Sequence, residues 1–246
     1  MKRHVLQLML VLLPLATLAN PAEWTRLFEE ARVAYDQGDF PLAVERYEVL
    51  LDQGRQDPEV LFNLGNALYR QGQAGQAIAR YREAQYQRPR DPDIQANLRV
   101  VQQQVGARAS EPGMHDRVLG QLSRQEWRTL GLACYWVAGL CGAGFLLARR
   151  HTWMKHLALL ALAGLLLAAL GTWYWHQYRR QPEAVVTRTG VQALFAPMPG
   201  AMVHFALPEG SRLRVHEQTE RWMKIAVGRQ EGWIPREACV PLSLPR

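Results

Sequence analysis

Residues recur at a spacing of 34 in the first 91 positions of this chain, and this period constrains the fold more than any other feature. The recurring pairs are Gly38 and Gly72, Ala43 and Ala77, and Tyr47 and Tyr81. A period of this length is typical of helical hairpins, in which glycine ends the first helix, alanine allows close approach and tyrosine fills the space between helices. We therefore expect two helical units, over 24–57 and 58–91.

The second unit resembles a tetratricopeptide repeat. The resemblance rests on the run Leu64-Gly65-Asn66-Ala67-Leu68-Tyr69, followed by Gly72, Ala77, Tyr81, Ala84 and Pro89. The first unit matches less well, since Glu30 and Ala31 stand where leucine and glycine are usual. Residues 92–105 begin like a third unit and then stop, so we expect a capping helix that completes a domain over 20–105. The resemblance implies an all-α superhelix that binds polypeptides and performs no chemistry.

The first helix of each hairpin lines the concave groove of such repeats, which identifies a candidate binding surface. The residues expected on this surface are Phe28, Arg32, Asn63, Asn66, Arg70 and Asn97. Asparagine amides can pair with a ligand backbone, and arginines attract carboxylates. The alternative for each asparagine is a hydrogen bond within the repeats. The carboxylate clamp of chaperone-binding repeats is not reproduced, since Phe28 and Asp93 replace its lysines.

The sequence begins with the pattern of a secretory signal over residues 1–19. Lys2 and Arg3 precede an apolar stretch from Val5 to Leu18, and small residues end it. An uncleaved anchor is the alternative. Further along, the polar stretch 106–128 predicts a linker.

Two uncharged apolar runs follow, over 129–148 and 157–175, and each is long enough to cross a bilayer. The eight residues 149–156 between them are basic and contain no acid, so we expect a cytoplasmic loop. A buried hairpin of a soluble protein is the alternative. The aromatic residues expected at the membrane interfaces are Trp127, Trp153, Trp173, Tyr174, Trp175 and Tyr178. An exported N-terminal domain and two spans would place both flanking domains outside the cytoplasm.

Hydrophobicity alternates with a period of two after Pro182, as in Leu213 and Val215, and the segment is punctuated by glycine turns. This pattern predicts a small β-barrel over 182–246. The segment resembles a bacterial SH3 (SH3b) domain through Leu207-Pro208-Glu209-Gly210, Arg221-Trp222-Met223-Lys224-Ile225 and Gly232-Trp233-Ile234-Pro235. We expect its ligand face to contain Trp222 and Trp233. The fold class is therefore multidomain: an all-α superhelix, a two-helix transmembrane hairpin and an SH3-like barrel.

The whole order of segments resembles the TPR–SH3 member of the Bat aerotolerance family. This resemblance implies a bacterial inner-membrane assembly with von Willebrand factor A-domain partners, and two periplasmic domains. We expect a membrane-anchored scaffold that binds a protein partner. The alternative is a wall anchor or envelope sensor that binds peptidoglycan through the SH3b segment.

Other function classes lack a signature in the sequence. The seven histidines are scattered without zinc-ligand spacing, and no nucleophile–base pair or nucleotide-binding loop is present. We therefore expect no enzymatic activity, metal or cofactor. The net charge of +7 does not form a basic stripe, so we expect no nucleic-acid partner. Basic residues instead flank the apolar stretches, at Lys2, Arg3, Arg149, Arg150, Lys155, Arg179 and Arg180.

Overall fold

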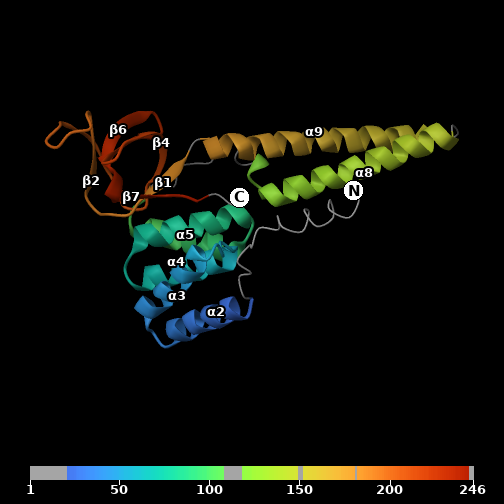
Figure 1. The fold of residues 1–246 in the computed structure, drawn as a ribbon. Helices are drawn as coiled ribbons and strands as arrows, with labels where there is room; N and C mark the ends of the chain where they lie inside the picture. The colour runs from blue at the N-terminus through green and yellow to red at the C-terminus, as the bar shows by residue number, and fades with distance from the viewer. Residues whose placement is uncertain (1–20, 108–117, 149–151, 181, 244–246) are drawn as a thin grey trace, which may run out of the picture.

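The computed structural model describes residues 21–107, 118–148, 152–180 and 182–243. Helical repeats, a long helical hairpin and a β-sheet follow one another along the chain (Figure 1). The signal expected over 1–19 lies outside the described residues. The helices of the repeat region are α2 (Pro21–Asp36), α3 (Phe40–Asp52), α4 (Pro58–Arg70), α5 (Ala74–Gln87) and α6 (Pro92–Gln104).

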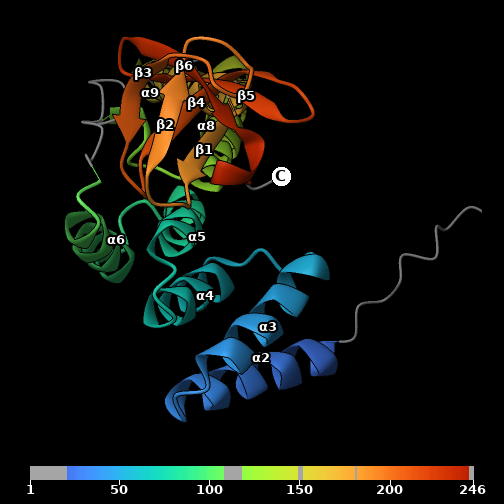
Figure 2. The same cartoon turned by 90° about the vertical axis from the view of Figure 1, so that its left-hand side faces the viewer.

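The repeat region consists of the hairpins α2–α3 and α4–α5, with α6 packed against α5 (Figure 2). Each hairpin turns at a glycine with φ near +82°, Gly38 in the first and Gly72 in the second. The amide after each glycine donates a hydrogen bond to a carbonyl in the last turn of the preceding helix, at 2.9 Å in both hairpins. Glycine is suited to this left-handed position because it has no Cβ.

A tyrosine fills the interior of each hairpin, as the period predicts. Tyr47 and Tyr81 are both almost fully buried. A Cβ added at Gly65 would lie 2.7 Å from the Tyr81 ring, so only glycine leaves room for this ring at the contact between α4 and α5. Burial raises the pKa of Tyr47 to about 12, and it raises the pKa of Tyr81 further. Both side chains are therefore neutral phenols at physiological pH.

Helices α8 (Arg124–Ala148) and α9 (Thr152–Arg180) pack along one another as an antiparallel hairpin (Figure 1). Small residues form the seam: a Cβ at Gly164 would lie 2.6 Å from Cys134 Sγ, and one at Gly171 would lie 2.1 Å from the Trp127 ring. Two boundaries differ from the sequence prediction. Because α8 begins at Arg124, the last five residues of the expected linker are helical, and because α9 begins at Thr152, so are the last five of the expected loop.

Within the described residues, one helix is long and apolar enough to cross a membrane. The qualifying stretch of α9 is Lys155–Gln177, with a mean hydropathy of 2.0 and few buried residues. Large apolar side chains of both helices lie on the outside of the hairpin. On α8 these include Leu132, Trp136 and Leu140, and on α9 they include Leu159, Leu160 and Leu166.

The C-terminal region is an antiparallel sheet with the strand order β3-β2-β6-β5-β4-β1-β7. The strands are β1 (Glu183–Val186), β2 (Val191–Leu194), β3 (Val203–Leu207), β4 (Arg212–Gln218), β5 (Trp222–Val227), β6 (Gln230–Pro235) and β7 (Cys239–Pro241). A short 3-10 helix (Arg236–Ala238) precedes β7. The predicted alternation is present, because Leu213, Val215, Met223 and Ile225 are buried in one cluster. The barrel closure expected of an SH3-like domain remains a prediction.

Strand β1 is buried on both faces, which links the sheet to the helices. Ala184 and Val186 belong to the core of the sheet, whereas Val185 belongs to the apolar core of the repeats. That second core also includes Trp127 and Trp175 from the base of the hairpin. A single apolar cluster therefore connects three segments that the sequence presents as separate domains.

Candidate protein-binding surface

The candidate binding residues lie on the first helix of each successive unit. Helix α2 contacts α4, and hydrogen bonds join α4 to α6, so these three helices form one face of the stack. We call this the α2–α4–α6 face. Phe28 and Arg32 lie on α2, Asn63, Asn66 and Arg70 on α4, and Asn97 on α6.

Asn66 is bound within the repeats. Its Oδ1 accepts hydrogen bonds from the Tyr81 hydroxyl at 2.7 Å and from Asn97 Nδ2 at 2.8 Å. It therefore connects α4 to both α5 and α6, and it satisfies the hydroxyl of a buried tyrosine. For Asn66 and Asn97 the structure thus contains the internal hydrogen bond that the sequence left as an alternative. No hydrogen bond joins the Asn63 side chain to another of the described residues.

The two arginines are exposed but already engaged. Arg32 pairs with Glu29 at 2.8 Å and with Asp36 at 3.3 Å. The hydrogen bond to Glu29 is the main cause that raises the pKa of this guanidinium. Arg70 lies over the Phe40 ring, 4.5 Å from its centroid. At Arg32, a ligand carboxylate would therefore compete with two acids. At Arg70, the contact among the described residues is with an aromatic ring.

Phe28 contributes to packing more than to the exposed surface. Its ring contacts Tyr47 edge-on at 5.8 Å and packs against the core of the repeats. The residues of the α2–α4–α6 face that remain suited to contact a partner are therefore Arg32, Asn63 and Arg70.

The opposite side of the second repeat is covered by the β-sheet. A Cβ at Gly75 would lie 2.6 Å from the Val186 carbonyl oxygen and 2.7 Å from Thr187 Cα. The Gly75 amide donates to Glu209 Oε1 at 2.6 Å. From the sheet side, Gly210 has φ +78°, and a Cβ there would lie 2.4 Å from Ile78 Cδ1. Gly75 thus brings the backbone of α5 into contact with the backbone of the sheet region, and Gly210 leaves room for the Ile78 side chain.

Two buried carboxylates reinforce this junction. Glu83, 1% exposed, pairs with Arg80 at 2.9 Å and accepts hydrogen bonds from the amide and hydroxyl of Ser243. Glu183, 5% exposed, accepts from the Tyr86 hydroxyl at 2.5 Å and pairs with Arg212 at 2.5 Å. Sequence analysis missed all of these residues. The signal in the sequence that could have indicated this junction is the glycine and alanine content of the face of α5 that contacts the sheet.

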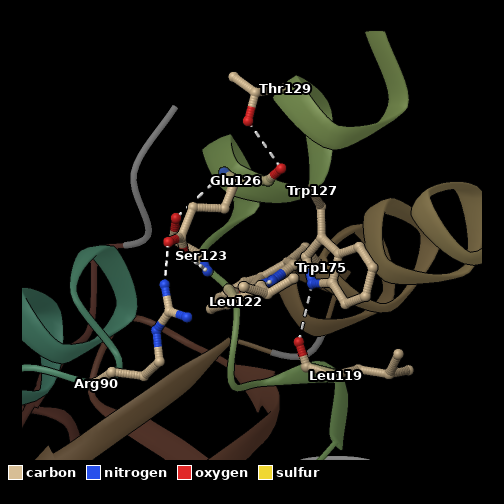
Figure 3. Close-up of polar contacts among 8 residues, drawn as sticks. All are labelled: Arg90, Leu119, Leu122, Ser123, Glu126, Trp127, Thr129 and Trp175. Carbon is tan, nitrogen blue, oxygen red and sulfur yellow. Dashed lines mark hydrogen bonds and ion pairs between the residues drawn. The ribbon is translucent and has the colours of Figure 1, made fainter. Parts of the chain in front are cut away.

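The base of the hairpin is held by indole hydrogen bonds to the segment before α8 and by an ion pair to the repeats (Figure 3). The Trp127 indole donates to the Leu119 carbonyl at 3.0 Å, and the Trp175 indole donates to the Leu122 carbonyl at 3.1 Å. Arg90, which follows α5 at the end of the second repeat, pairs with Glu126 of α8.

This arrangement corrects the sequence prediction for two tryptophans. Trp127 and Trp175 were expected at the membrane interface, but both are buried within the protein. Trp153 and Trp173, by contrast, are exposed. Tyr174 is half-buried beside Trp175, and the Tyr178 side chain lies outside the described part of the chain.

Trp222 and Trp233 lie on the outer face of the sheet, on the adjacent strands β5 and β6. Trp222 lines a cleft of about 590 Å³ together with Pro199, Glu220, Arg221, Pro235, Arg236 and Glu237. Trp233 does not line this cleft and pairs with Lys224 and Leu194 across the strands.

The cysteine of the sheet region is Cys239, at the start of β7. Cys239 is buried with its Sγ 3.3 Å from Met223 Sδ. Burial raises the pKa of this thiol to about 11, so it is protonated at neutral pH. Among the described residues, no group of three histidine, cysteine or acidic side chains could hold a metal ion.

Comparison with known proteins agrees with the geometry of the repeats. Residues 28–92 match the tetratricopeptide repeat family. The match begins within α2 and extends to the first residue of α6, so it includes both hairpin turns. No curated protein matches the chain. Residues 28–92 thus contain tetratricopeptide repeats, a class of fold that mediates protein–protein interaction.

Proposed function

We propose that this chain is a membrane-anchored scaffold of the bacterial cell envelope, whose α2–α4–α6 face binds a protein partner. The match of residues 28–92 to tetratricopeptide repeats is the observation that supports this proposal most strongly. Arg32 and Arg70 are exposed on that face, while the opposite side of α5 is covered by the sheet. Partner binding is therefore assigned to the uncovered side.

The α8–α9 hairpin is proposed to be the membrane anchor. The apolar composition of α9 and the exposed leucines and tryptophans on both helices support insertion into lipid. The repeats and the sheet both contact the same end of the hairpin (Figure 1). Insertion of the hairpin would therefore leave both regions on one side of the bilayer.

The resemblance to the TPR–SH3 member of the Bat aerotolerance family supports finer assignments. On this basis the membrane is the bacterial inner membrane, and both folded regions face the periplasm. The partner is then a membrane protein with a von Willebrand factor A domain. No reaction is assigned to the chain.

Substitutions on the α2–α4–α6 face test partner binding. The full chain should be used in mild detergent, since an isolated repeat domain would uncover the face of α5 that contacts the sheet. We expect Arg32→Ala combined with Arg70→Ala to reduce partner recovery at least about tenfold, because two charged contacts are lost. Affinity capture followed by quantitative mass spectrometry gives the measurement.

Glu48→Ala, which removes an exposed charge on α3, is the matched control and should leave recovery unchanged. Asn66 is unsuitable as a probe, because its loss would remove the acceptor to which the buried Tyr81 hydroxyl donates. Equal recovery with the double variant and the control would rule out this face as the binding site.

Alkaline phosphatase fusions test the orientation of the hairpin. Phosphatase is active only after export, so we expect activity for fusions at positions 110 and 246 and none at position 152. The expected pattern follows from an exported repeat domain and a basic connection that stays inside. Activity at 152 alone would place both folded regions in the cytoplasm.

The cleft beside Trp222 supports a second candidate function, a wall anchor that binds peptidoglycan. The two functions differ in one measurement. A wall anchor would sediment with purified peptidoglycan and lose this property in Trp222→Ala, whereas a scaffold would remain in solution.

A further inference from the structure

A cleft of about 570 Å³ lies between the second repeat and the base of the hairpin. Asp57 and Pro58 contribute to it from the start of α4, and Tyr86 and Arg88 from the end of α5. The opposite wall comes from the end of the 118–123 segment and the first turns of α8, as far as Leu132. The cleft thus lies where the proposed anchor leaves the membrane.

The charges in this cleft are predominantly positive. Arg88, Arg124 and Arg128 line it, and Asp57 is the acid among its described lining residues. Asp57 is already paired with Arg55 at 2.8 Å. The acid closest to Arg88 is Asp91, at 3.9 Å, and Glu126 of α8 is engaged by Arg90. A concave site whose charged lining residues are mainly cations concentrates the field and favours an anion, and arginine is suited to phosphate.

The order of residues on α8 indicates which anion fits. Arg124, Arg128 and Leu132 are spaced four residues apart, so they follow one face of the helix. Leu132 is 61% exposed, and the exposed apolar surface of the hairpin continues beyond it. Along this face of the helix the side chains change from cationic to apolar. A phospholipid changes in the same order, from its phosphate to its acyl chains. A free phosphate ion would leave Leu132 uncovered.

We infer that this cleft binds the phosphate of an anionic phospholipid, with an acyl chain against Leu132. The inference rests on the proposed insertion of the hairpin into a membrane. Arg88 belongs to the repeats and Arg128 to the hairpin, so one bound lipid contacts both. The site therefore positions the repeat domain against the bilayer surface, in addition to the protein contacts at the junction.

The test measures lipid binding by the full chain in neutral detergent, using native mass spectrometry. The probes are phosphatidylglycerol, phosphatidylcholine and sodium phosphate. We expect the chain to prefer phosphatidylglycerol and the variant Arg88→Gln/Arg128→Gln to bind it at least about tenfold more weakly, since two charge-assisted contacts are lost. Arg26→Gln/Arg99→Gln removes the same charge from exposed positions elsewhere and should bind like the native chain. Arg88→Gln alone, outside α8, should show part of the loss.

Three results would overturn the inference: equal affinity for phosphatidylcholine, equal affinity for free phosphate, or unchanged binding in both Arg88 variants. Flotation with vesicles of phosphatidylcholine separates these from a failure of the proposed anchor. If the native chain does not float, the hairpin is not a membrane anchor, and the inference of a lipid site is rejected together with it. If the chain floats but the Arg88 variants bind phosphatidylglycerol normally, only the lipid site is wrong.

Discussion

Replacing Gly75 by valine is expected to open the junction between the repeats and the sheet while each remains folded. The new Cβ would lie 2.6 Å from the Val186 carbonyl oxygen and 2.7 Å from Thr187 Cα, and a backbone contact cannot be relieved by a rotamer change. We expect a cost of about 2 kcal/mol, or roughly a thirtyfold increase in local opening. Hydrogen exchange at the Ser243 amide, which donates to Glu83 Oε1 across the junction at 2.7 Å, reports this opening.

Gln73→Val is the matched control for this prediction. It introduces the same side chain two residues before Gly75, at an exposed position. The control should retain native exchange at the Ser243 amide. If both variants exchange at the native rate, close approach of Gly75 does not stabilise the junction.

Replacing Glu183 by alanine is expected to destabilise the whole chain by about 3–5 kcal/mol. The substitution leaves the guanidinium of Arg212, 18% exposed, and the buried Tyr86 hydroxyl without the acceptor that they share. Loss of a buried carboxylate that accepts a hydrogen bond and an ion pair is more costly than the loss of an ion pair in water. Thermal and denaturant unfolding of the full chain in detergent, followed by circular dichroism, measures the effect.

The sheet offers an exposed pair for comparison. Arg188 and Glu237 approach to 3.0 Å, but their side chains are 58% and 71% exposed. We expect Glu237→Ala to cost about 1 kcal/mol or less, because water screens such pairs. Similar losses in Glu183→Ala and Glu237→Ala would mean that the Glu183 contacts do not stabilise the junction.

These contacts have a consequence for the proposed scaffold. Glu183 lies three residues after the end of α9 and contacts α5 through Tyr86, while Trp175 of α9 contacts Tyr86 edge-on at 6.1 Å. The α8–α9 hairpin, the repeats and the sheet therefore meet around one tyrosine. A partner bound to the α2–α4–α6 face would be held in a defined orientation to the membrane.

The sequence by itself determined the repeats and the alternation of the strands, because both depend on local periodicity. The 34-residue spacing places glycine at each hairpin turn and tyrosine between each pair of helices, and these roles are satisfied within one repeat. It also identified the apolar runs of α8 and α9. The boundaries of these helices differ from the apolar runs, because α8 begins at Arg124 and α9 at Thr152, before the first residue of each uncharged run.

Only the tertiary structure decided which side of the second repeat is covered. In α3 the positions equivalent to Gly75, Ala79 and Tyr86 are Pro41, Glu45 and Asp52, and all three are exposed. In α5 they are buried, because β1 covers them from about a hundred residues further along the chain. The spacing of residues along the sequence contains no signal for that contact. The same reason explains why Trp127 and Trp175 lie in the protein interior: their burial depends on partners brought together by the fold, not on their distance from an apolar run.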